Sequence, residues 1–405
     1  MHLVILTQYY PPEVGAPQTR LSELAQMAVA QGHRVTVLTA MPNYPSGKIH
    51  PGYGGLVKRE RREGVDIIRT AIYPTQRVDF VHRLANYFSF VVSSSLFGAF
   101  LLKRADFLMV ESPPLFLGLA GIWLSRLKRA RMIFNVSDLW PESAVYLGVI
   151  RRDSWQFKLS SWLEALCYRK AWVVTGQARS ILASIKDRFP SSRTFLLSNG
   201  VDTKRFGPKL RSNEARRTLG PPDAFIILYA GLHGIAQGLD QVLAAAREML
   251  DKPEFRFVLI GDGPEKEKLQ QDAERLGLSN VTFLDSRPQS DIPALLASAD
   301  TVLVPLKTYI PGAVPSKLYE AMSSGQPVIL VASGEAAQIT REHGAGLIVE
   351  PGDMTGLVKA LSTLRDSHGL RRALGENGRR AAEEHFDRTR IVTRFVRFLE
   401  RHARR

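Results

Sequence analysis

Short apolar segments recur along the whole chain, and helix-like segments lie between most of them. The first series comprises Leu3–Thr7, Val35–Thr39, Ile67–Thr70, Phe107–Val110, Met132–Val136, Trp172–Thr175 and Thr194–Leu197. The second series comprises Phe225–Tyr229, Arg256–Ile260, Val281–Leu284, Thr301–Val304, Val328–Val331 and Leu347–Val349. This alternation is typical of βαβ units with helices on both faces of a parallel sheet. We therefore predict an α/β fold with two doubly wound, Rossmann-like domains.

The length of 405 residues supports this division, because single hydrophobic cores stop growing at about 250–300 residues. Turn residues interrupt the periodicity over 199–222, which places the boundary there. We expect an amino-terminal domain over 1–205 and a second domain over 206–387. An amphipathic helix over 388–405 is expected to pack back onto the first domain. The single cysteine, Cys167, excludes an intramolecular disulfide and a Cys-rich zinc site.

The positive charge is unevenly distributed. The net charge is +15, with 27 Lys+Arg against 14 Asp+Glu over 1–205, and 27 against 25 over the remainder. Such asymmetry favours an anionic partner of the first domain, either nucleic acid or a membrane surface, although a merely soluble basic surface remains the alternative. A basic nucleic-acid-binding protein without enzymatic activity is therefore one candidate function. No recognition helix, zinc finger or RNP motif supports it.

One apolar stretch, Tyr87–Leu102, suits a membrane surface. Its 16 residues include four serines and fall short of the roughly 20 needed to span a bilayer. Basic residues flank it at Arg83, Lys103 and Arg104. We expect an interfacial helix that binds anionic membranes, and a buried core helix is the competing interpretation. No signal peptide is expected at the amino terminus, so we predict a cytoplasmic protein at the inner face of the membrane.

Several enzyme signatures are missing, including the dinucleotide fingerprint, the P-loop, H-E-x-x-H and G-x-S-x-G. A sugar-nucleotide epimerase is disfavoured because the fingerprint and a Tyr-x-x-x-Lys pair are both absent. Glycine-rich loops follow the strands instead, where open α/β sheets bind ligands. The loop residues that we predict to bind a diphosphate-containing ligand are Gly15, Gly231, His233, Gly234, Gln237, Gly261, Asp262 and Gly263. Each loop taken alone could equally be a rigid turn.

The segment 314–322 is more informative. It contains Val314, Pro315, Ser316, Lys317, Leu318 and Glu320, all of which we assign to the same ligand site. Proline suits the first turn of a helix, where Ser316 and Lys317 would present donors to a phosphate. Glu320 lies about one turn further on, where a carboxylate can accept both hydroxyls of a ribose. Arg287, in the loop over 285–288, is expected beside the base.

In the first domain, two carboxylates follow a predicted buried strand. Asp138 and Glu142 lie four positions apart in the sequence. Carboxylates at a strand end can bind sugar hydroxyls or act as a base. We assign both as catalytic candidates, with capping of a short helix by Asp138 as the alternative. Asn43 and Tyr44 follow the second strand and suit contact with an acceptor sugar, or form only a turn. Tyr10 follows the first strand in a similar loop.

Together these residues resemble retaining nucleotide-sugar glycosyltransferases of family 4 with the GT-B fold, in which two Rossmann-like domains face a cleft. The motifs carrying the resemblance span nearly the whole chain: Asn199–Asp202 with Phe206, the 231–238 loop, Gly261–Gly263, Pro315–Glu320 and Gly325–Val328. The segments 9–13, 43–45, 112–115, 138–142 and 236–239 resemble the fucosaminyl-transferase-like branch of O-antigen and capsule synthesis.

The resemblance implies transfer of a sugar, with retention, from a UDP-sugar to a lipid-diphosphate-linked saccharide in cell-surface polysaccharide synthesis. It also implies that the ligand-site residues of the two domains' loops and of segment 314–320 bind the sugar donor, and that Tyr10, Asn43 and Tyr44 contact the acceptor. It implies no cofactor beyond the donor, and no metal site is visible in the sequence. Four positions depart from the family pattern. His233 and Gln237 stand in a loop where many members carry Arg and Lys, Gly312 replaces a first Glu, and Ser137 stands for a strand-end histidine.

Overall fold

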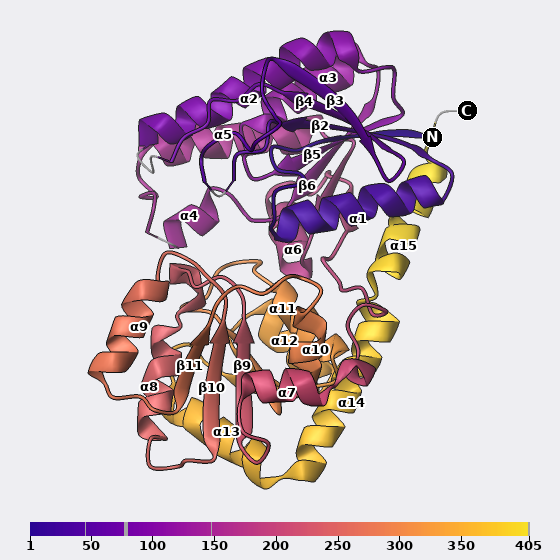
Figure 1. The fold of residues 1–405 in the computed structure, drawn as a ribbon. Helices are drawn as coiled ribbons and strands as arrows, with labels where there is room; N and C mark the ends of the chain where they lie inside the picture. The colour runs from indigo at the N-terminus through magenta and orange to yellow at the C-terminus, as the bar shows by residue number, and fades with distance from the viewer. Residues whose placement is uncertain (45, 77–79, 147, 404–405) are drawn as a thin grey trace. The chain divides into compact units, whose positions relative to one another are not determined.

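The computed structural model describes residues 1–44, 46–76, 80–146 and 148–403, and it contains two compact units (Figure 1). Unit 1 comprises Met1–Asn199 with Thr389–Arg405, and unit 2 comprises Gly200–Arg388. The division lies a few residues before the expected one, because Val201 and Phe206 pack in the core of unit 2. Unit 1 carries 31 Lys+Arg and 14 Asp+Glu, a net +17, whereas unit 2 carries 23 and 25, a net −2. The positive charge of the chain therefore resides in unit 1.

Unit 1 is built on a sheet with the strand order β3-β4-β2-β1-β5-β6-β7-β8. Its strands are β1 (His2–Leu6), β2 (Arg34–Ala40), β3 (Val57–Arg62), β4 (Val65–Thr70), β5 (Phe107–Ser112), β6 (Arg131–Val136), β7 (Val173–Gly176) and β8 (Thr194–Leu196). All neighbouring pairs are parallel except β3 and β4, which form an antiparallel pair. The order in which the chain adds strands to the sheet reverses between β1 and β5. Open α/β sheets bind ligands at the carboxyl ends of the strands on either side of such a reversal.

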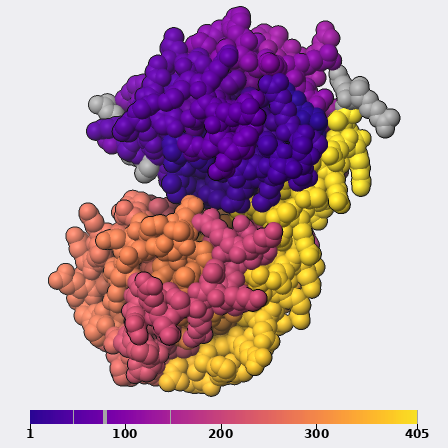
Figure 2. Space-filling model, turned by 45° about the vertical axis from the view of Figure 1, so that its right-hand side comes forward, coloured from indigo at the N-terminus to yellow at the C-terminus, as the bar shows by residue number. Residues whose placement is uncertain are grey.

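Two layers of helices cover this sheet. The helices are α1 (Ala16–Ala30), α2 (Phe80–Leu101), α3 (Leu117–Leu127), α4 (Glu142–Tyr146), α5 (Trp155–Lys170), α6 (Arg179–Arg188) and α15 (Arg388–Glu400). Apolar side chains of α1 and α15 share one core with alternate residues of the central strands. Helices α2, α3 and α5 pack on the opposite face, with α3 in contact with both of the others (Figure 1). The yellow terminal helix α15 lies on the surface of unit 1 (Figure 2).

Unit 2 contains a sheet with the order β11-β10-β9-β12-β13-β14, and all its neighbouring pairs are parallel. The strands are β9 (Phe225–Ala230), β10 (Phe255–Ile260), β11 (Val281–Leu284), β12 (Thr301–Pro305), β13 (Val328–Val331) and β14 (Gly346–Val349). This is the 3-2-1-4-5-6 order of a Rossmann fold. The strand order reverses between β9 and β12, and Rossmann folds bind nucleotides at the carboxyl ends of the strands beside such a reversal.

The helices of unit 2 cover both faces of its sheet and enclose two apolar cores. They are α7 (Asn213–Leu219), α8 (Asp240–Glu248), α9 (Lys266–Arg275), α10 (Ile292–Ser298), α11 (Ser316–Ser323), α12 (Glu335–Glu342), α13 (Met354–Asp366) and α14 (His368–His385), with short 3-10 helices η1 (Pro208–Leu210) and η2 (Ile235–Gln237). Several begin at the residue types that favour helix starts. The side chains of Ser212, Asp353 and Ser367 each accept a hydrogen bond from a backbone N–H of the first turn.

The structure confirms the predicted α/β class and every predicted strand, with shifts of one or two residues at the ends. It adds β3, which the sequence did not indicate because Val57–Arg62 is charged and lacks apolar alternation. It also corrects the expected length of the apolar helix. Helix α2 has 22 residues, and its segment Val81–Leu101 is by length and composition sufficient to cross a membrane.

Candidate active site

Two loops interlock at the carboxyl ends of β9 and β10 in unit 2. The backbone N–H of Gly231 donates to the carbonyl of Ile260 at 2.8 Å, and that of His233 donates to the carbonyl of Asp262 at 2.8 Å. The N–H of Glu265 in turn donates to the carbonyl of His233 at 2.9 Å. These bonds fix the backbone of both glycine-rich loops next to the point where the strand order reverses.

The glycines permit this close approach. Gly261 and Gly263 have φ angles of 147° and 152°, a region that side chains rarely adopt. A Cβ atom on Gly261 would overlap the carbonyl oxygen of Gly231, and one on Gly263 would press against the backbone of His233. A Cβ atom on Gly231 would overlap the side chain of Lys317. Three segments that are distant in sequence therefore converge on one small volume.

His233 is fully buried in this volume. Neither ring nitrogen has a hydrogen-bond partner among the described residues, although the carbonyl of Ile260 lies close enough to favour the protonated ring weakly. Burial and then the charge of Lys266 lower the pKa of His233 to about 4. The imidazole is therefore neutral at pH 7, when one ring nitrogen carries a proton to donate and the other can accept.

Gln237 lies beside this histidine loop. Its Oε1 atom is buried without a hydrogen-bond partner and is adjacent to the buried Gly234. Unpaired polar atoms cost free energy when they are buried, so such atoms are rare in native proteins outside functional sites. His233 and Gln237 thus leave unsatisfied polar atoms in the same small region.

Helix α11 begins at this region, as the sequence predicted. Pro315 occupies its N-cap position, and Ser316 and Lys317 form the first turn, where backbone N–H groups have no intrahelical acceptor. Leu318 is completely buried and anchors the turn in the core that Val314 also contacts. Glu320 lies one turn further along and is partly exposed. The ammonium group of Lys317 and the helix start provide positive potential for an anion.

Two predicted donor residues are more peripheral. Arg287 is exposed in the loop after β11, and the side chain of Asp262 is also exposed. In the same loop region, Lys266 Nζ lies 2.7 Å from Asp285 Oδ1. The structure therefore brings the glycine loops and the start of α11 together, and it leaves Arg287 at the rim.

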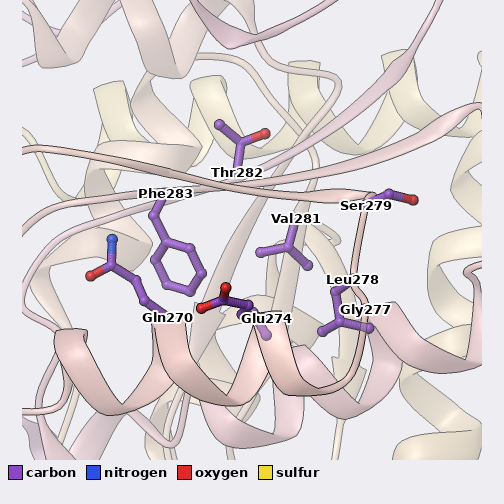
Figure 3. A pocket seen from close by; sticks show the side chains of 9 residues that line it. Gln270, Glu274, Gly277, Leu278, Ser279, Val281, Thr282 and Phe283 are labelled. Carbon is purple, nitrogen blue, oxygen red and sulfur yellow. The ribbon is translucent and has the colours of Figure 1, made fainter.

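A hollow of about 610 Å³ lies elsewhere in unit 2, between α9 and β11 (Figure 3). It is lined by Gln270, Ala273, Glu274, Gly277, Leu278, Ser279, Val281, Thr282 and Phe283. This hollow is wide open and contains none of the predicted donor residues. We therefore place the candidate ligand site at the ends of β9 and β10, where hydrogen-bonding groups converge, and not in this hollow.

In unit 1, a buried polar cluster lies at the reversal point between β1 and β5. Arg20 of α1 pairs with Glu111 of β5, with 2.5 Å between Nη2 and Oε1. Asn135 Nδ2 donates to the other oxygen of Glu111 at 2.7 Å, and Ser137 Oγ donates to Oε1. Gln177, after β7, lies against Ser137 and Arg20. Sequence analysis missed Arg20 and Glu111, although an acidic residue in the apolar run of β5 was a signal for the second.

Asp138 directly follows this cluster. Its side chain is exposed and makes no hydrogen bond to the residues that the structure describes, so it does not cap α4. Partial desolvation and then the carboxylate of Glu111 raise the pKa of Asp138, and Arg20 opposes that rise. An accessible carboxylate beside a buried ion pair can bind a hydroxyl or accept a proton.

Glu142 is placed differently from Asp138. Its Oε1 atom lies 3.2 Å from Nη1 of Arg188, whose guanidinium also pairs with the buried Glu164 at 2.7 Å and 2.9 Å. The Arg188 ion pair holds Glu142 at the start of α4, and this contact favours a structural role over the predicted catalytic one. The two carboxylates therefore have different environments despite their sequence spacing.

The predicted acceptor residues also separate. The Tyr10 ring is only 2% exposed and packs in the apolar core of unit 1, so the prediction that it contacts an acceptor is not supported by its position. Asn43 is buried and its Nδ2 donates to the carbonyl of Met41 at 2.9 Å. Tyr44 is exposed, and its ring lies edge-on to that of Tyr9. Tyr44 is thus the accessible member of this set.

Gly15 occupies the N-cap of α1 in unit 1, in extended backbone. A Cβ atom there would overlap the side chain of Gln18, whose Oε1 is buried without a partner. Because the amide end of Gln18 can move, this contact does not by itself require glycine at the position. The contact of Gly15 with the donor stays a prediction. Among the described residues, no group of three or more His, Cys, Asp and Glu side chains could hold a metal ion.

Comparison with known families assigns both halves of the chain. Residues 15–200 match the glycosyl transferase 4-like domain, and residues 211–381 match the family glycosyl transferases group 1. The chain is a glycosyltransferase. These matches disfavour the rival interpretation of a nucleic-acid-binding protein without transferase activity.

The transferase has relatives over its full length. It is 26% identical over 98% of the chain to the putative colanic acid biosynthesis glycosyl transferase WcaI of Escherichia coli K12, covering 99% of that protein. Its fold is similar to that of sucrose-phosphate synthase from Thermosynechococcus elongatus, with TM-score 0.78, 18% identity and coverage of 99% and 98% of the two chains. It is also similar to Anabaena Alr3699/HepE in complex with UDP-glucose, with TM-score 0.73, 19% identity and coverage of 99% and 100%. The transferase therefore has the GT-B fold, and it is similar to a protein named as a putative transferase of colanic acid biosynthesis.

Proposed function

We propose that this transferase moves a sugar, with retention, from a UDP-sugar to a lipid-diphosphate-linked saccharide in cell-surface polysaccharide synthesis. The observation that carries the proposal is the convergence of the 231–237 loop, Gly261–Gly263 and the first turn of α11 at the strand reversal of unit 2. That volume contains unsatisfied polar atoms and a positive helix start, as a diphosphate requires. A structural neighbour described in complex with UDP-glucose supports the choice of nucleotide.

Within this proposal, the donor diphosphate lies against the backbone N–H groups at the start of α11. Lys317 neutralises part of its charge, and the neutral His233 donates a hydrogen bond to a phosphoryl oxygen. Glu320 accepts the ribose hydroxyls, and Arg287 lies near the base. Preorganised donors of this kind stabilise charge that develops in a transition state.

The reaction then breaks the bond between the anomeric carbon and the diphosphate oxygen and forms a bond to an acceptor hydroxyl on the same face. The departing diphosphate takes the hydroxyl proton. Lys317, His233 and the helix start stabilise the negative charge on this leaving group. In this mechanism protein groups stabilise the charge of the leaving group, and no cofactor or metal takes part.

We assign the acceptor to unit 1, with Asp138 in contact with the acceptor hydroxyl or the transferred sugar. The buried pair of Arg20 and Glu111 holds Ser137 and the end of β6 in place beside Asp138. Tyr44 provides an exposed ring for a sugar face. Resemblance to the fucosaminyl-transferase-like branch supports an acceptor in O-antigen or capsule synthesis, and a lipid-linked acceptor would place the enzyme at the inner face of the cytoplasmic membrane.

The decisive experiment incubates the full chain with a panel of UDP-sugars and a polyprenyl-diphosphate sugar, and measures release of UDP and formation of a lipid-linked product. We expect turnover with at least one UDP-sugar and retained anomeric configuration by NMR. Lys317→Ala should lower UDP affinity at least about tenfold, because a charge-assisted contact is worth about 1.5–3 kcal/mol. Lys359→Ala on α13 is the matched control in the same unit. Turnover only with another nucleotide, or equal UDP affinity in both variants, would refute the assignment of the donor.

A further inference from the structure

Three helices of unit 1 share an unusual outer surface. On α2, Phe88, Val92, Leu96 and Phe100 follow one another at four-residue spacing and are all exposed, with Phe100 at 78%. Residues four apart on a helix lie on one face, so these side chains form a continuous stripe. Large contiguous apolar surfaces are rare on soluble monomers and indicate a binding partner.

The neighbouring helices extend this stripe. Trp123 and Leu127 of α3 are four residues apart, and Trp155, Leu159 and Trp162 of α5 follow at spacings of four and three. Trp123 is 53% exposed and Trp162 is 60% exposed. Because α3 contacts both α2 and α5, the three stripes cover one layer of the unit. We call this surface the helix α2-α3-α5 face, defined by the exposed apolar residues named in these two paragraphs.

Helix α2 is held against the domain along its opposite side. Asn86 accepts a hydrogen bond from Gln8 at 2.8 Å and donates one to the carbonyl of Tyr73 at 2.7 Å. Ser93 Oγ lies 3.0 Å from Thr70 Oγ1, and Phe90 is fully buried. A bilayer-spanning α2 would lose these contacts. The helix therefore lies along the sheet and presents only its outer stripe.

The charges around this face are nearly all positive. The sequences of α2 and α3 contain no Asp or Glu, and the only acid of α5, Glu164, is buried in its pair with Arg188. The exposed Asp153, which directly precedes the N-cap of α5, pairs with Arg151. Exposed basic residues on these helices or at their ends are Arg83, Lys103, Arg104, Arg126, Arg129, Lys158, Arg169 and Lys170. The face thus has exposed apolar residues, including tryptophans, with basic residues around them. This combination is complementary to an anionic lipid surface, because tryptophan side chains favour the membrane interface and lysine and arginine side chains favour anionic headgroups.

We infer that the helix α2-α3-α5 face docks unit 1 onto an anionic bilayer, with Phe100, Trp123 and Trp162 inserted at the interface. The apolar stripes enter the boundary between headgroups and acyl chains, and the basic residues contact lipid phosphates. This inference rests on the proposed function for its biological setting, since a lipid-linked acceptor is presented at a membrane. Its test measures lipid binding separately from sugar transfer and UDP binding.

The test is co-sedimentation of the full chain with vesicles of phosphatidylglycerol and phosphatidylcholine, and with vesicles of phosphatidylcholine alone. The inference expects binding to the anionic vesicles that high salt reverses, and weaker binding to the neutral ones. The variant Phe100→Ser/Trp123→Ser/Trp162→Ser should lower the partition coefficient at least about tenfold. Its melting temperature and UDP affinity should be unchanged, because all three side chains are exposed.

Two further variants separate the contributions. Lys103→Gln with Arg126→Gln should weaken binding to anionic vesicles by about fivefold per residue and leave the residual binding to neutral vesicles unchanged. Leu210→Ser with Leu250→Ser changes exposed apolar residues of unit 2 and is the control that should bind like the unaltered chain.

Three outcomes would overturn the inference. The first is vesicle binding that does not depend on the proposed contacts, seen either as equal binding by the triple variant and the control or as equal binding to anionic and neutral vesicles. The second is a dimer that the triple variant abolishes, with no vesicle binding, which would make a second copy the partner. The third is association that resists high salt and alkaline extraction, which would indicate a spanning helix. Lost vesicle binding with unchanged UDP affinity separates failure of docking from failure of the donor site.

Discussion

Glu13 Oε1 accepts a hydrogen bond from the backbone N–H of Asn43 at 2.8 Å. The same oxygen accepts a second bond from the N–H of Tyr44 at 2.9 Å, and Oε2 accepts one from Tyr10 at 3.2 Å. One buried carboxylate thus joins the loop after β1 to the loop after β2 and orients the segment that exposes Tyr44. Burial raises the pKa of Glu13, whereas the three N–H groups oppose that rise.

Glu13→Gln should disturb the acceptor loops without affecting the donor site. A glutamine that keeps its oxygen towards Asn43 and Tyr44 directs its NH2 group at the N–H of Tyr10, so two donors face each other. An unsatisfied buried donor costs about 1–3 kcal/mol. We expect a lower melting temperature and an acceptor KM raised by at least about fivefold, with UDP affinity unchanged. An unchanged acceptor KM in the destabilised variant would limit Glu13 to a structural role.

Glu320→Gln should weaken nucleotide binding while leaving the fold intact. In the proposed site the change removes a charge-assisted bond to the ribose hydroxyls, worth roughly 1.5–3 kcal/mol, or about 10- to 150-fold in affinity. Calorimetry with UDP measures the effect. Glu267→Gln, at an exposed position in the first turn of α9, is the control. If both variants bind UDP equally well, the ribose is not bound at Glu320.

Asp138→Asn should lower turnover by at least about 100-fold if this carboxylate acts on the acceptor or the transferred sugar. Initial rates with saturating donor and acceptor measure the loss. Asp153→Asn, at a well-exposed site in the same unit, should leave the rate unchanged. Glu142→Gln should lower stability more than turnover, because its carboxylate pairs with Arg188. Near-normal turnover in Asp138→Asn would remove the acceptor assignment of that residue.

The buried His233 should make unit 2 less stable in mild acid. Its folded-state pKa of about 4 lies below the ordinary value of 6.5, so the unfolded chain binds more protons between those pH values. The stability is fully present above pH 6.5 and is lost as the pH falls towards 4. We expect this residue to account for about 1–2 kcal/mol of lost unfolding free energy between pH 7 and 5.

Urea unfolding of the chain and of His233→Asn, each at pH 7 and pH 5, isolates that contribution from those of other titrating groups. The variant should show a smaller loss on acidification than the unaltered chain. The same pH dependence in both proteins would mean that His233 titrates normally in the folded state.

The elements of the sheets could be predicted because buried parallel strands are continuous apolar runs bounded by turns. β3 could not, since an edge strand such as Val57–Arg62 is paired through its backbone and keeps its charged side chains in water. The length of α2 was underestimated for a similar reason. Its first turns contain His82 and Arg83, and these polar residues conceal the helical continuity that packing against the sheet supplies.

The candidate donor site could be predicted from the sequence only where its features are local. The sequence alone determined which residues follow β9 and β10 and which begin α11, because glycines, prolines and helix starts act over a few residues. Only the tertiary structure decided that Gly231, Gly263, His233 and Lys317 share one volume, since that depends on the order of strands in the sheet.

The same division holds in unit 1. The sequence determined that Asp138 follows a buried strand, and a four-residue spacing made Glu142 look like its partner. The tertiary structure decided otherwise, because Arg188 is 46 residues away in sequence and yet pairs with Glu142. It also joined Arg20 to Glu111 across 91 residues. Residue type and local spacing specify secondary structure and helix starts, whereas ion pairs and burial arise from long-range packing that no local pattern encodes.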